Sequence, residues 1–189
     1  MTTSTTLTEI RTLPLAALRL SQTRAQIERR AHLNKDAIAE LAESIRSVGV
    51  VQPILVRPAP AESDAYEIVA GERRYLAAKQ AGLAEIPASI RQLNDEQVLE
   101  LQLVENLQRQ DLHELAEAEG YEALLKLGWS VEQIAAKVGK SIGTVYARMR
   151  LLALCKEARK AFYDGRLNAS TALLLARIPV ESLQKQALK

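Results

Sequence analysis

Apolar residues recur at three- and four-residue spacing in one early segment of the chain, between Asn34 and Gly49. The apolar positions of this segment are Ala37, Ile38, Leu41, Ile45 and Val48. This is the period of an α-helix that buries one face. Asn34 can cap the start of such a helix and Gly49 can end it, so the pattern predicts a helix between these two residues.

Short apolar runs bounded by Pro and Gly follow this helix and predict strands. Residues 53–57 and 66–69 are predicted to be two strands, joined by a Pro-containing turn over 58–64. A further strand is predicted over 86–91.

Two more helices are predicted in the same half of the chain. Gly71 opens a helix that runs to about Ala81 and stops at Gly82. The run 94–97, Asn-Asp-Glu-Gln, is similar to a capping box and starts a helix that extends through Leu107.

From His113 onward the chain shows helical patterns and no strand-like stretch. The breaks between them fall at Gly128, Gly139 and Gly165. We therefore predict an α+β protein with a domain boundary near Asp111 to His113: a small α/β domain over 1–112 and an all-helical domain over 113–189.

A helix-turn-helix is predicted over about Val131 to Leu152. Ala135 allows two helices to cross closely, Gly139 four residues later supplies the turn, and Val145 anchors the second helix in the core. Ser141 can cap the second helix, whose start would then face base edges in the major groove of DNA. Tyr121, Trp129 and Cys155 are predicted to be core residues.

Basic residues concentrate in and after this motif. Between residues 137 and 160 seven basic residues stand against one acidic residue, whereas the whole chain carries a net charge of only +2. The candidate DNA contacts are Lys140, Ser141, Gly143, Thr144, Tyr146, Arg148 and Arg150. Arginine can bond guanine bidentately or neutralise phosphate, and the sequence leaves this choice open. A solvated helical hairpin is the alternative interpretation.

Composition narrows the remaining classes of protein. Cys155 is the lone cysteine, and His32 and His113 lie far apart, so neither a disulfide framework nor a Cys/His metal site is predicted. The apolar stretches, such as 171–176, are far shorter than the roughly 20 residues of a membrane helix. Residues 1–6 lack the blocks of a signal peptide, and a cytoplasmic location without membrane contact is expected. The helical pattern over 184–189 has no stop signal, as expected of a truncated chain.

Two polar motifs carry possible phosphate and metal chemistry. Gly71-Glu72-Arg73-Arg74 follows a strand and opens a helix, so its amides, the helix dipole and two arginines can form a polyphosphate cradle. Glu105 and Asn106 place a carboxylate and an amide oxygen at one helix end, which suits Mg²⁺ held together with a nucleotide's phosphates. Taken alone, each motif is also compatible with an ordinary solvated helix end.

In order along the chain, these segments resemble the ParB family of DNA partition proteins. The resemblance is carried by AESIRSVGVVQPILVR within 39–57, GERRYLAA over 71–78 and ENLQRQDL over 105–112. The helix-turn-helix follows at the family's spacing, with Gly139-Lys140-Ser141 and Arg150-Leu151-Leu152 matching its pattern. The resemblance extends from about Leu13 to Ile178.

The resemblance implies a ParB/sulfiredoxin-like N-terminal domain that binds CTP and Mg²⁺, and a helical domain that loads at a centromere-like site on double-stranded DNA. It also implies that CTP favours self-dimerisation of the N-terminal domains, which closes a sliding clamp, and that a ParA-type ATPase is a partner. The nucleotide-binding residues implied are Gly49, Gln52, Pro53, Gly71, Glu72, Arg73, Arg74, Asn106 and Arg109. Glu105 and Asn106 would serve Mg²⁺, and Glu105 a slow, regulatory CTP hydrolysis.

Three departures from the family pattern bear on this transfer. Leu76 replaces an arginine that commonly follows the aromatic residue of the GERR motif. The Pro-Arg segment near the start appears here as Gln22-Thr23-Arg24, followed by a charged insertion over 26–32. Ser170-Thr171-Ala172 stands where the family has Gly-His-Ala.

Two other functions remain open from the sequence. Leu76 motivates a transcriptional repressor that binds DNA without nucleotide control. An enzyme on the sulfiredoxin-like scaffold, a nuclease or phosphotransferase, is the third hypothesis, but sulfiredoxin-type chemistry needs a cysteine in the nucleotide domain and Cys155 lies beyond it.

Overall fold

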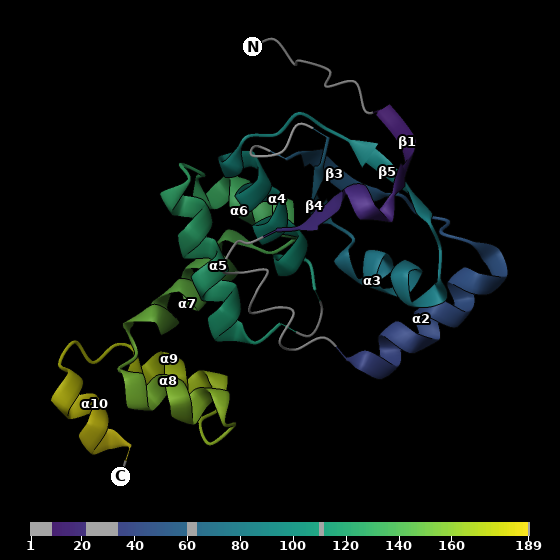
Figure 1. Ribbon diagram of the computed structural model, residues 1–189. Coiled ribbons are helices and arrows are strands. Elements are labelled where there is room, and N and C mark those ends of the chain that lie inside the picture. The colour runs from purple at the N-terminus through teal and green to yellow at the C-terminus, as the bar shows by residue number, and fades with distance from the viewer. Residues whose placement is uncertain (1–8, 22–33, 60–63, 110–111, 189) are drawn as a thin grey trace. The chain divides into compact units, whose positions relative to one another are not determined.

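The computed structural model describes residues 9–21, 34–59, 64–109 and 112–188 (Figure 1). The chain divides into two compact units, Met1–Val98 and Leu99–Lys189. The division falls inside a helix, α4 (Asp95–Leu107), so each unit is described separately below. The boundary at residue 112 stays a prediction.

The first unit is an α/β structure built on one five-stranded sheet. Its elements are β1 (Glu9–Pro14), the 3-10 turn η1 (Leu15–Ala17), β2 (Leu18–Leu20), α2 (Lys35–Val48), β3 (Ile54–Pro58), β4 (Tyr66–Ala70), α3 (Glu72–Ala81) and β5 (Glu85–Ile90). The strand order is β1-β5-β3-β4-β2. β1 pairs with β5 and β3 with β4 in antiparallel fashion, whereas β3–β5 and β2–β4 are parallel pairs.

Two helices pack in sequence onto this sheet. Tyr75 and Ala78 of α3 belong to the apolar core that includes Ile54 and Ile86 of the sheet. The neighbouring Ala77 belongs to a second core with Ile38, Ala42 and Ile45 of α2. Helix α3 is therefore the middle layer between the sheet and α2 (Figure 1).

The helices and strands predicted in this unit are confirmed. Asn34 Oδ1 accepts a hydrogen bond from the amide of Asp36 at 2.9 Å, and Gly49 ends α2. The edge strands β1 and β2 were not predicted: Leu13 of β1 and Leu18 of β2 belong to the core, but Ile10 of β1 is 64% exposed and β2 has three residues. One buried residue in so short a strand is too few for an alternation of apolar and polar residues to be recognised.

A buried arginine joins three parts of this unit. Arg57 Nε donates to Glu67 Oε2 at 2.8 Å, and its other nitrogens bond the carbonyl oxygen of Leu93 and reach Asp95 Oδ1 at 2.7 Å. Burial lowers the pKa of the guanidinium, but the bonds to Glu67 and Asp95 more than offset it and raise the pKa above its ordinary value. The charged Arg57 thus fixes the start of α4 to the sheet.

The second unit is helical throughout its described residues. Beyond α4 its elements are α5 (Glu114–Lys126), α6 (Val131–Val138), α7 (Ile142–Arg150), the 3-10 turn η2 (Leu151–Ala153), α8 (Lys156–Tyr163), α9 (Ala169–Leu175) and α10 (Glu181–Ala187). The predicted breaks are confirmed, since Gly128, Gly139 and Gly165 all have positive φ angles. None of the described helices is long and apolar enough to cross a membrane.

Two apolar cores hold this unit together. One contains Leu107 of α4, Tyr121 of α5 and Val145 of α7, with Trp129 packed against it. The other contains Leu151, Cys155 and residues of α8 and α9. The prediction that Tyr121 and Cys155 are buried is confirmed, and Trp129 is half-buried.

Helix α10 is fastened to the second core by a buried polar side chain. Gln184 is 2% exposed. Its amide nitrogen donates to the carbonyl oxygens of Ala153 and Ile178, and its Oε1 accepts from the amide of Cys155 at 2.7 Å. The Gln184 side chain thus bonds three backbone groups, two of which lie 29 and 31 residues away in the sequence.

Candidate functional site

A glycine at the end of β4 shapes the start of α3. Gly71 has φ +95°, a conformation that L side chains rarely adopt. A Cβ at this position would lie 2.9 Å from Ile54 Cγ2 and 3.1 Å from Arg74 Nη2. In the described residues no side chain caps the first turn of α3. Only a glycine therefore fits this turn, because it lets Ile54 and the Arg74 guanidinium approach the backbone closely.

Arg74 connects this helix start to the turn before β3. Its Nη1 donates to the carbonyl oxygen of Gln52 at 2.7 Å and to that of Pro53. Two of the predicted segments, Gln52-Pro53 and Gly71–Arg74, are therefore brought together by one side chain. Of the other residues of the motif, Glu72 is half-buried and Arg73 is exposed.

A cavity of about 220 Å³ lies beside Arg74 within the first unit. It is lined by three residues that the sequence singled out, Gly49, Gln52 and Arg74. The other lining residues were not singled out: Leu41, Ser44, Ile45, Val48, Val50 and Val51. In the sequence, Leu41, Ile45 and Val48 were assigned only to the apolar face of the predicted helix. Together with Val50 and Val51 after Gly49, this run of apolar residues is the signal that could have indicated the cavity wall.

Glu105, Asn106 and Arg109 lie at and beyond the end of α4, in the second unit. Glu105 and Arg109 are exposed, and the carbonyl oxygen of Asn106 accepts from the amide of Arg109 at 3.2 Å. Among the described residues, no group of three or more His, Cys, Asp and Glu side chains is placed to hold a metal ion. The assignment of Mg²⁺ to Glu105 and Asn106 stays a prediction.

The helix-turn-helix has the local geometry that the sequence predicts. Ser130 and Gln133 form a reciprocal capping box at the start of α6, and Gly139 ends this helix with φ +69°. Ser141 Oγ accepts from the amide of Thr144 at 3.0 Å and so caps α7. Ala135 and Val145 are buried between the helices. The second helix is α-helical to Arg150 and then continues as the 3-10 turn η2.

The predicted DNA contacts divide into exposed and engaged side chains. Lys140, Ser141, Gly143, Tyr146 and Arg150 are exposed, and Thr144 is half-buried. Arg148 is different. Its Nε donates to Glu117 Oε2 at 2.9 Å and its Nη1 lies 2.6 Å from Glu114 Oε2, so α7 is ion-paired to α5.

The carboxylate of Glu117 is the centre of this ion-pair group. Its side chain is 9% exposed, and Lys140 Nζ lies 4.0 Å from its second oxygen. Tyr121 lies one turn further along α5, fully buried. Burial raises the pKa of the Tyr121 hydroxyl to about 12, and the charge of Glu117 acts in the same direction.

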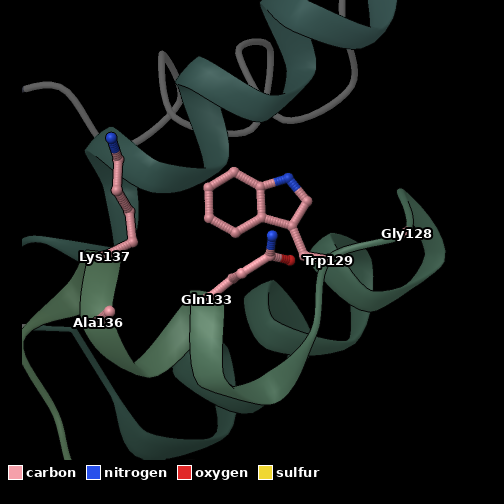
Figure 2. Close-up of a pocket in the computed structure, with 5 residues that line it drawn as sticks. All are labelled: Gly128, Trp129, Gln133, Ala136 and Lys137. Carbon is pink, nitrogen blue, oxygen red and sulfur yellow. The ribbon is translucent and has the colours of Figure 1, made fainter. Parts of the chain in front are cut away.

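A second cavity, of about 510 Å³, lies beside α6 (Figure 2). It is lined by Gly128, Trp129, Gln133, Ala136 and Lys137, and Figure 2 shows the Trp129 ring above the Gln133 side chain. None of the predicted nucleotide or DNA residues lines it. The larger hollow is therefore separate from the chemistry that the sequence indicates.

Comparison with known families assigns both halves of the chain. Residues 1–107 match the ParB N-terminal domain, and residues 110–189 match the ParB HTH domain. The chain belongs to the ParB family. The predicted fold class, an α/β N-terminal domain followed by a helical helix-turn-helix domain, is confirmed.

Relatives and solved ParB structures agree with this assignment. The chromosome-partitioning protein Spo0J of Thermus thermophilus is 46% identical over 169 residues, which cover 89% of this chain and 60% of the relative. A C-terminally truncated ParB from Caulobacter crescentus complexed to the centromeric parS site is 38% identical, with a TM-score of 0.76, and the match covers 94% of this chain and 91% of that one.

A second Caulobacter crescentus ParB structure, complexed with CTP-γ-S, is 39% identical, with a TM-score of 0.49; the match covers 96% of this chain and 99% of that chain. The chain spans 49–60% of the length of the curated relatives it matches.

The departures from the ParB pattern have structural correlates where the chain is described. Leu76, which replaces an arginine, is half-buried against the cores on both sides of α3. Thr171 lies in the first turn of α9, where its amide donates to Asn168 Oδ1 at 2.8 Å. Residues 22–24 and 26–32 lie outside the described residues.

Proposed function

We propose that this chain is the nucleotide- and DNA-binding part of a partition protein, which loads at a specific double-stranded site and is switched by CTP. The observation that carries the proposal is the presence in one chain of two features. One is the turn at Gly71, which Arg74 joins to Gln52, and the other is a capped helix-turn-helix with exposed basic side chains at Lys140 and Arg150.

The DNA-binding part rests on α6 and α7. Ser141 caps α7, so the start of this helix is well ordered for insertion into the major groove. The exposed Lys137, Lys140 and Arg150 supply positive charge along the motif, which favours contact with phosphates. The similarity to a ParB complexed to parS supports a centromere-like site.

The nucleotide-binding part rests on the residues around Arg74. Because Gly71 has no Cβ, the Arg74 guanidinium lies close to the backbone at the start of α3, where the helix dipole favours negative charge and a phosphate group could bind the amides and the guanidinium together. Arg73 and Arg74 add two cationic groups that can pair with phosphate oxygens. The cavity lined by Gly49, Gln52 and Val50 would take the sugar and base. The choice of CTP rests on the ParB motifs.

The residues at the end of α4 complete the proposed switch. In the ParB pattern, Glu105 and Asn106 would bind Mg²⁺ with the phosphates, and Arg109 would contact the nucleotide. Magnesium would supply charge neutralisation between the phosphates. Glu105 would accept the proton of the attacking water in a slow hydrolysis of CTP. This hydrolysis would reset the switch.

The switch itself is a shift between two populations. Two copies of the chain would associate through their N-terminal domains and enclose DNA, and CTP would bind the closed state better than the open one. A tenfold preference for the closed state is worth about 1.4 kcal/mol. A ParA-type ATPase is the proposed further partner.

Measuring CTP affinity tests the nucleotide part of the proposal. The intact chain should bind CTP in the presence of Mg²⁺, and Arg74→Ala should weaken binding at least tenfold because it removes a charge-assisted phosphate contact. Arg46→Ala is the control, since Arg46 is an exposed arginine of the same unit that does not line the cavity. An intact chain that does not bind CTP excludes the switch.

A nucleotide-independent repressor is the second candidate, favoured by Leu76, which stands where the ParB pattern commonly has an arginine and cannot pair with phosphate. This candidate predicts tight DNA binding together with self-crosslinking that is the same with and without CTP. The partition proposal predicts crosslinking that increases with CTP.

A further inference from the structure

The exposed face of α7 is apolar where the helix begins. Ile142 is 45% exposed and Tyr146 is 51% exposed. They lie four residues apart, hence on one face of the helix, and Val145 of the adjacent face is fully buried. Gly143, beside them, is exposed and carries no side chain. We call Ile142, Gly143 and Tyr146 the apolar stripe, although the Tyr146 ring ends in a hydroxyl, the one polar side-chain group of the three.

The hydrogen-bonding side chains near the stripe are already engaged within the motif. Ser141 Oγ accepts from the amide of Thr144, and the Ser141 and Thr144 hydroxyls lie 2.8 Å apart in a second hydrogen bond. Arg148 is paired with Glu114 and Glu117. Of the side chains that could read a base by hydrogen bonds, Ser141, Thr144 and Arg148 are therefore engaged within the protein, whereas the cations Lys140 and Arg150 are exposed at the two ends of the stripe.

The charges around the stripe indicate what covers it. Lys140 precedes α7 with 46% of its side chain exposed, and Arg150 lies one turn beyond Tyr146 on the same face of the helix. A stripe of apolar side chains between cationic ends complements the major groove, where phosphates border the base edges. Thymine is the base that presents a methyl group there.

We infer that Ile142 and Tyr146 read the 5-methyl groups of thymines, so that the DNA site of this chain is selected at these positions by apolar contact. Gly143 lets the helix approach the base edges closely. Arg150 contacts phosphate, and Arg148 orients α7 without touching DNA. This inference rests on the DNA-binding part of the proposed function and adds the bases that the motif selects.

Replacing thymine by uracil tests the inference, because uracil lacks only the 5-methyl group. The site is first selected with this chain from a pool of random duplexes and then synthesised with thymine or with deoxyuridine at each position. Each thymine that contacts the stripe should cost about fourfold in affinity when it becomes uracil. In Ile142→Ala, the ratio of the affinity for the thymine duplex to the affinity for the uracil duplex should fall close to one at one of these positions.

Leu183→Ala is the matched control, since Leu183 is 48% exposed on α10, outside the motif. It should keep the full thymine-to-uracil ratio, and thermal unfolding should show that both variants are folded. Equal affinities for the thymine and uracil duplexes overturn the inference and leave DNA binding intact. Failure to enrich any duplex overturns the DNA-binding proposal itself. Loss of self-association in Ile142→Ala, with an unchanged ratio, also overturns the inference and assigns the stripe to a second copy.

Discussion

Arg74 Nη1 donates a hydrogen bond to the carbonyl oxygen of Gln52, and the two atoms lie 2.7 Å apart. This contact joins the first turn of α3 to the wall of the cavity that contains Gly49. A guanidinium has five N–H donors, so Arg74 can keep this backbone contact and still offer donors to a phosphate. One side chain can thus serve both this structural contact and the proposed phosphate contact.

The two glycines of this region should respond differently to alanine. Gly71→Ala adds a Cβ 2.9 Å from Ile54 Cγ2 at a φ of +95°, so it should cost about 2–4 kcal/mol and abolish nucleotide binding. Gly49→Ala meets no neighbouring atom within 4 Å, but at φ +75° and ψ −175° the backbone conformation is essentially restricted to glycine, so it should cost about 1–3 kcal/mol from backbone strain alone. Urea unfolding compares the two. Equal losses in the free energy of unfolding would contradict a cost from the close contact between the added Cβ and Ile54.

The ion pair between Arg148 and Glu117 should contribute to stability more than to DNA affinity. Arg148→Met leaves Glu117, 9% exposed, beside an apolar side chain, and should destabilise the second unit by about 3 kcal/mol. The double variant with Glu117→Gln should recover part of the loss. Chemical unfolding of the single and double variants measures the coupling.

The salt dependence of DNA binding separates Arg148 from Arg150. Arg150→Met should lower the slope of log affinity against log salt by about 1, as expected for one lost phosphate contact. Arg148→Met, measured where it is folded, should leave the slope unchanged. A reduced slope for Arg148→Met would assign Arg148 to phosphate, as the sequence alone allows.

Tyr121 should make stability sensitive to alkaline pH. Its pKa in the folded state is about 12, above the ordinary value of 10.0, so the folded protein favours the neutral hydroxyl over the phenolate. The stabilisation is complete below pH 10 and is lost as pH rises toward 12, by up to about 1.4 kcal/mol per pH unit. Tyr121→Phe should remove this component and be close to neutral at pH 7, because the hydroxyl has no hydrogen-bond partner among the described residues. Parallel unfolding curves of both proteins from pH 7 to 12 check this, and a constant difference between them would contradict it.

Gln184 should anchor α10 strongly for a polar residue. Gln184→Leu leaves the amide of Cys155 and the carbonyl oxygens of Ala153 and Ile178 without their bonds, and should cost about 2–4 kcal/mol. Gln186→Leu, at an exposed position of the same helix, should change stability by less than about 0.5 kcal/mol. Thermal unfolding distinguishes them.

The sequence predicts the elements that bury a periodic apolar face or carry their own stop signals. Helix α2 shows both, between Asn34 and Gly49, and the helix-turn-helix shows them in Ala135, Gly139 and Val145. The edge strands β1 and β2 are not predicted because the buried Leu13 and Leu18 give no repeating pattern, and the strands are defined by their pairing in the sheet.

The candidate sites were predicted as residue types but not as contacts. The sequence marks Arg74 and Arg148 equally as cations, and only the fold shows that one bonds Gln52 and the other is paired with Glu114 and Glu117. Such partners are distant along the chain, at separations of 22 residues for Arg74 and 31 for Arg148 with Glu117, and local patterns carry no information on them.

The central claim, a DNA clamp closed by CTP, is tested most directly by the amount of protein held on DNA whose ends are free or blocked. With CTP and Mg²⁺, the proposed clamp of two protein chains would slide off the free ends of a DNA duplex but would not pass blocked ends. The account predicts that CTP makes retention on the blocked duplex exceed retention on the free one, and that without CTP the two are equal. Equal retention in the presence of CTP, by a chain that binds both nucleotide and DNA, would contradict it.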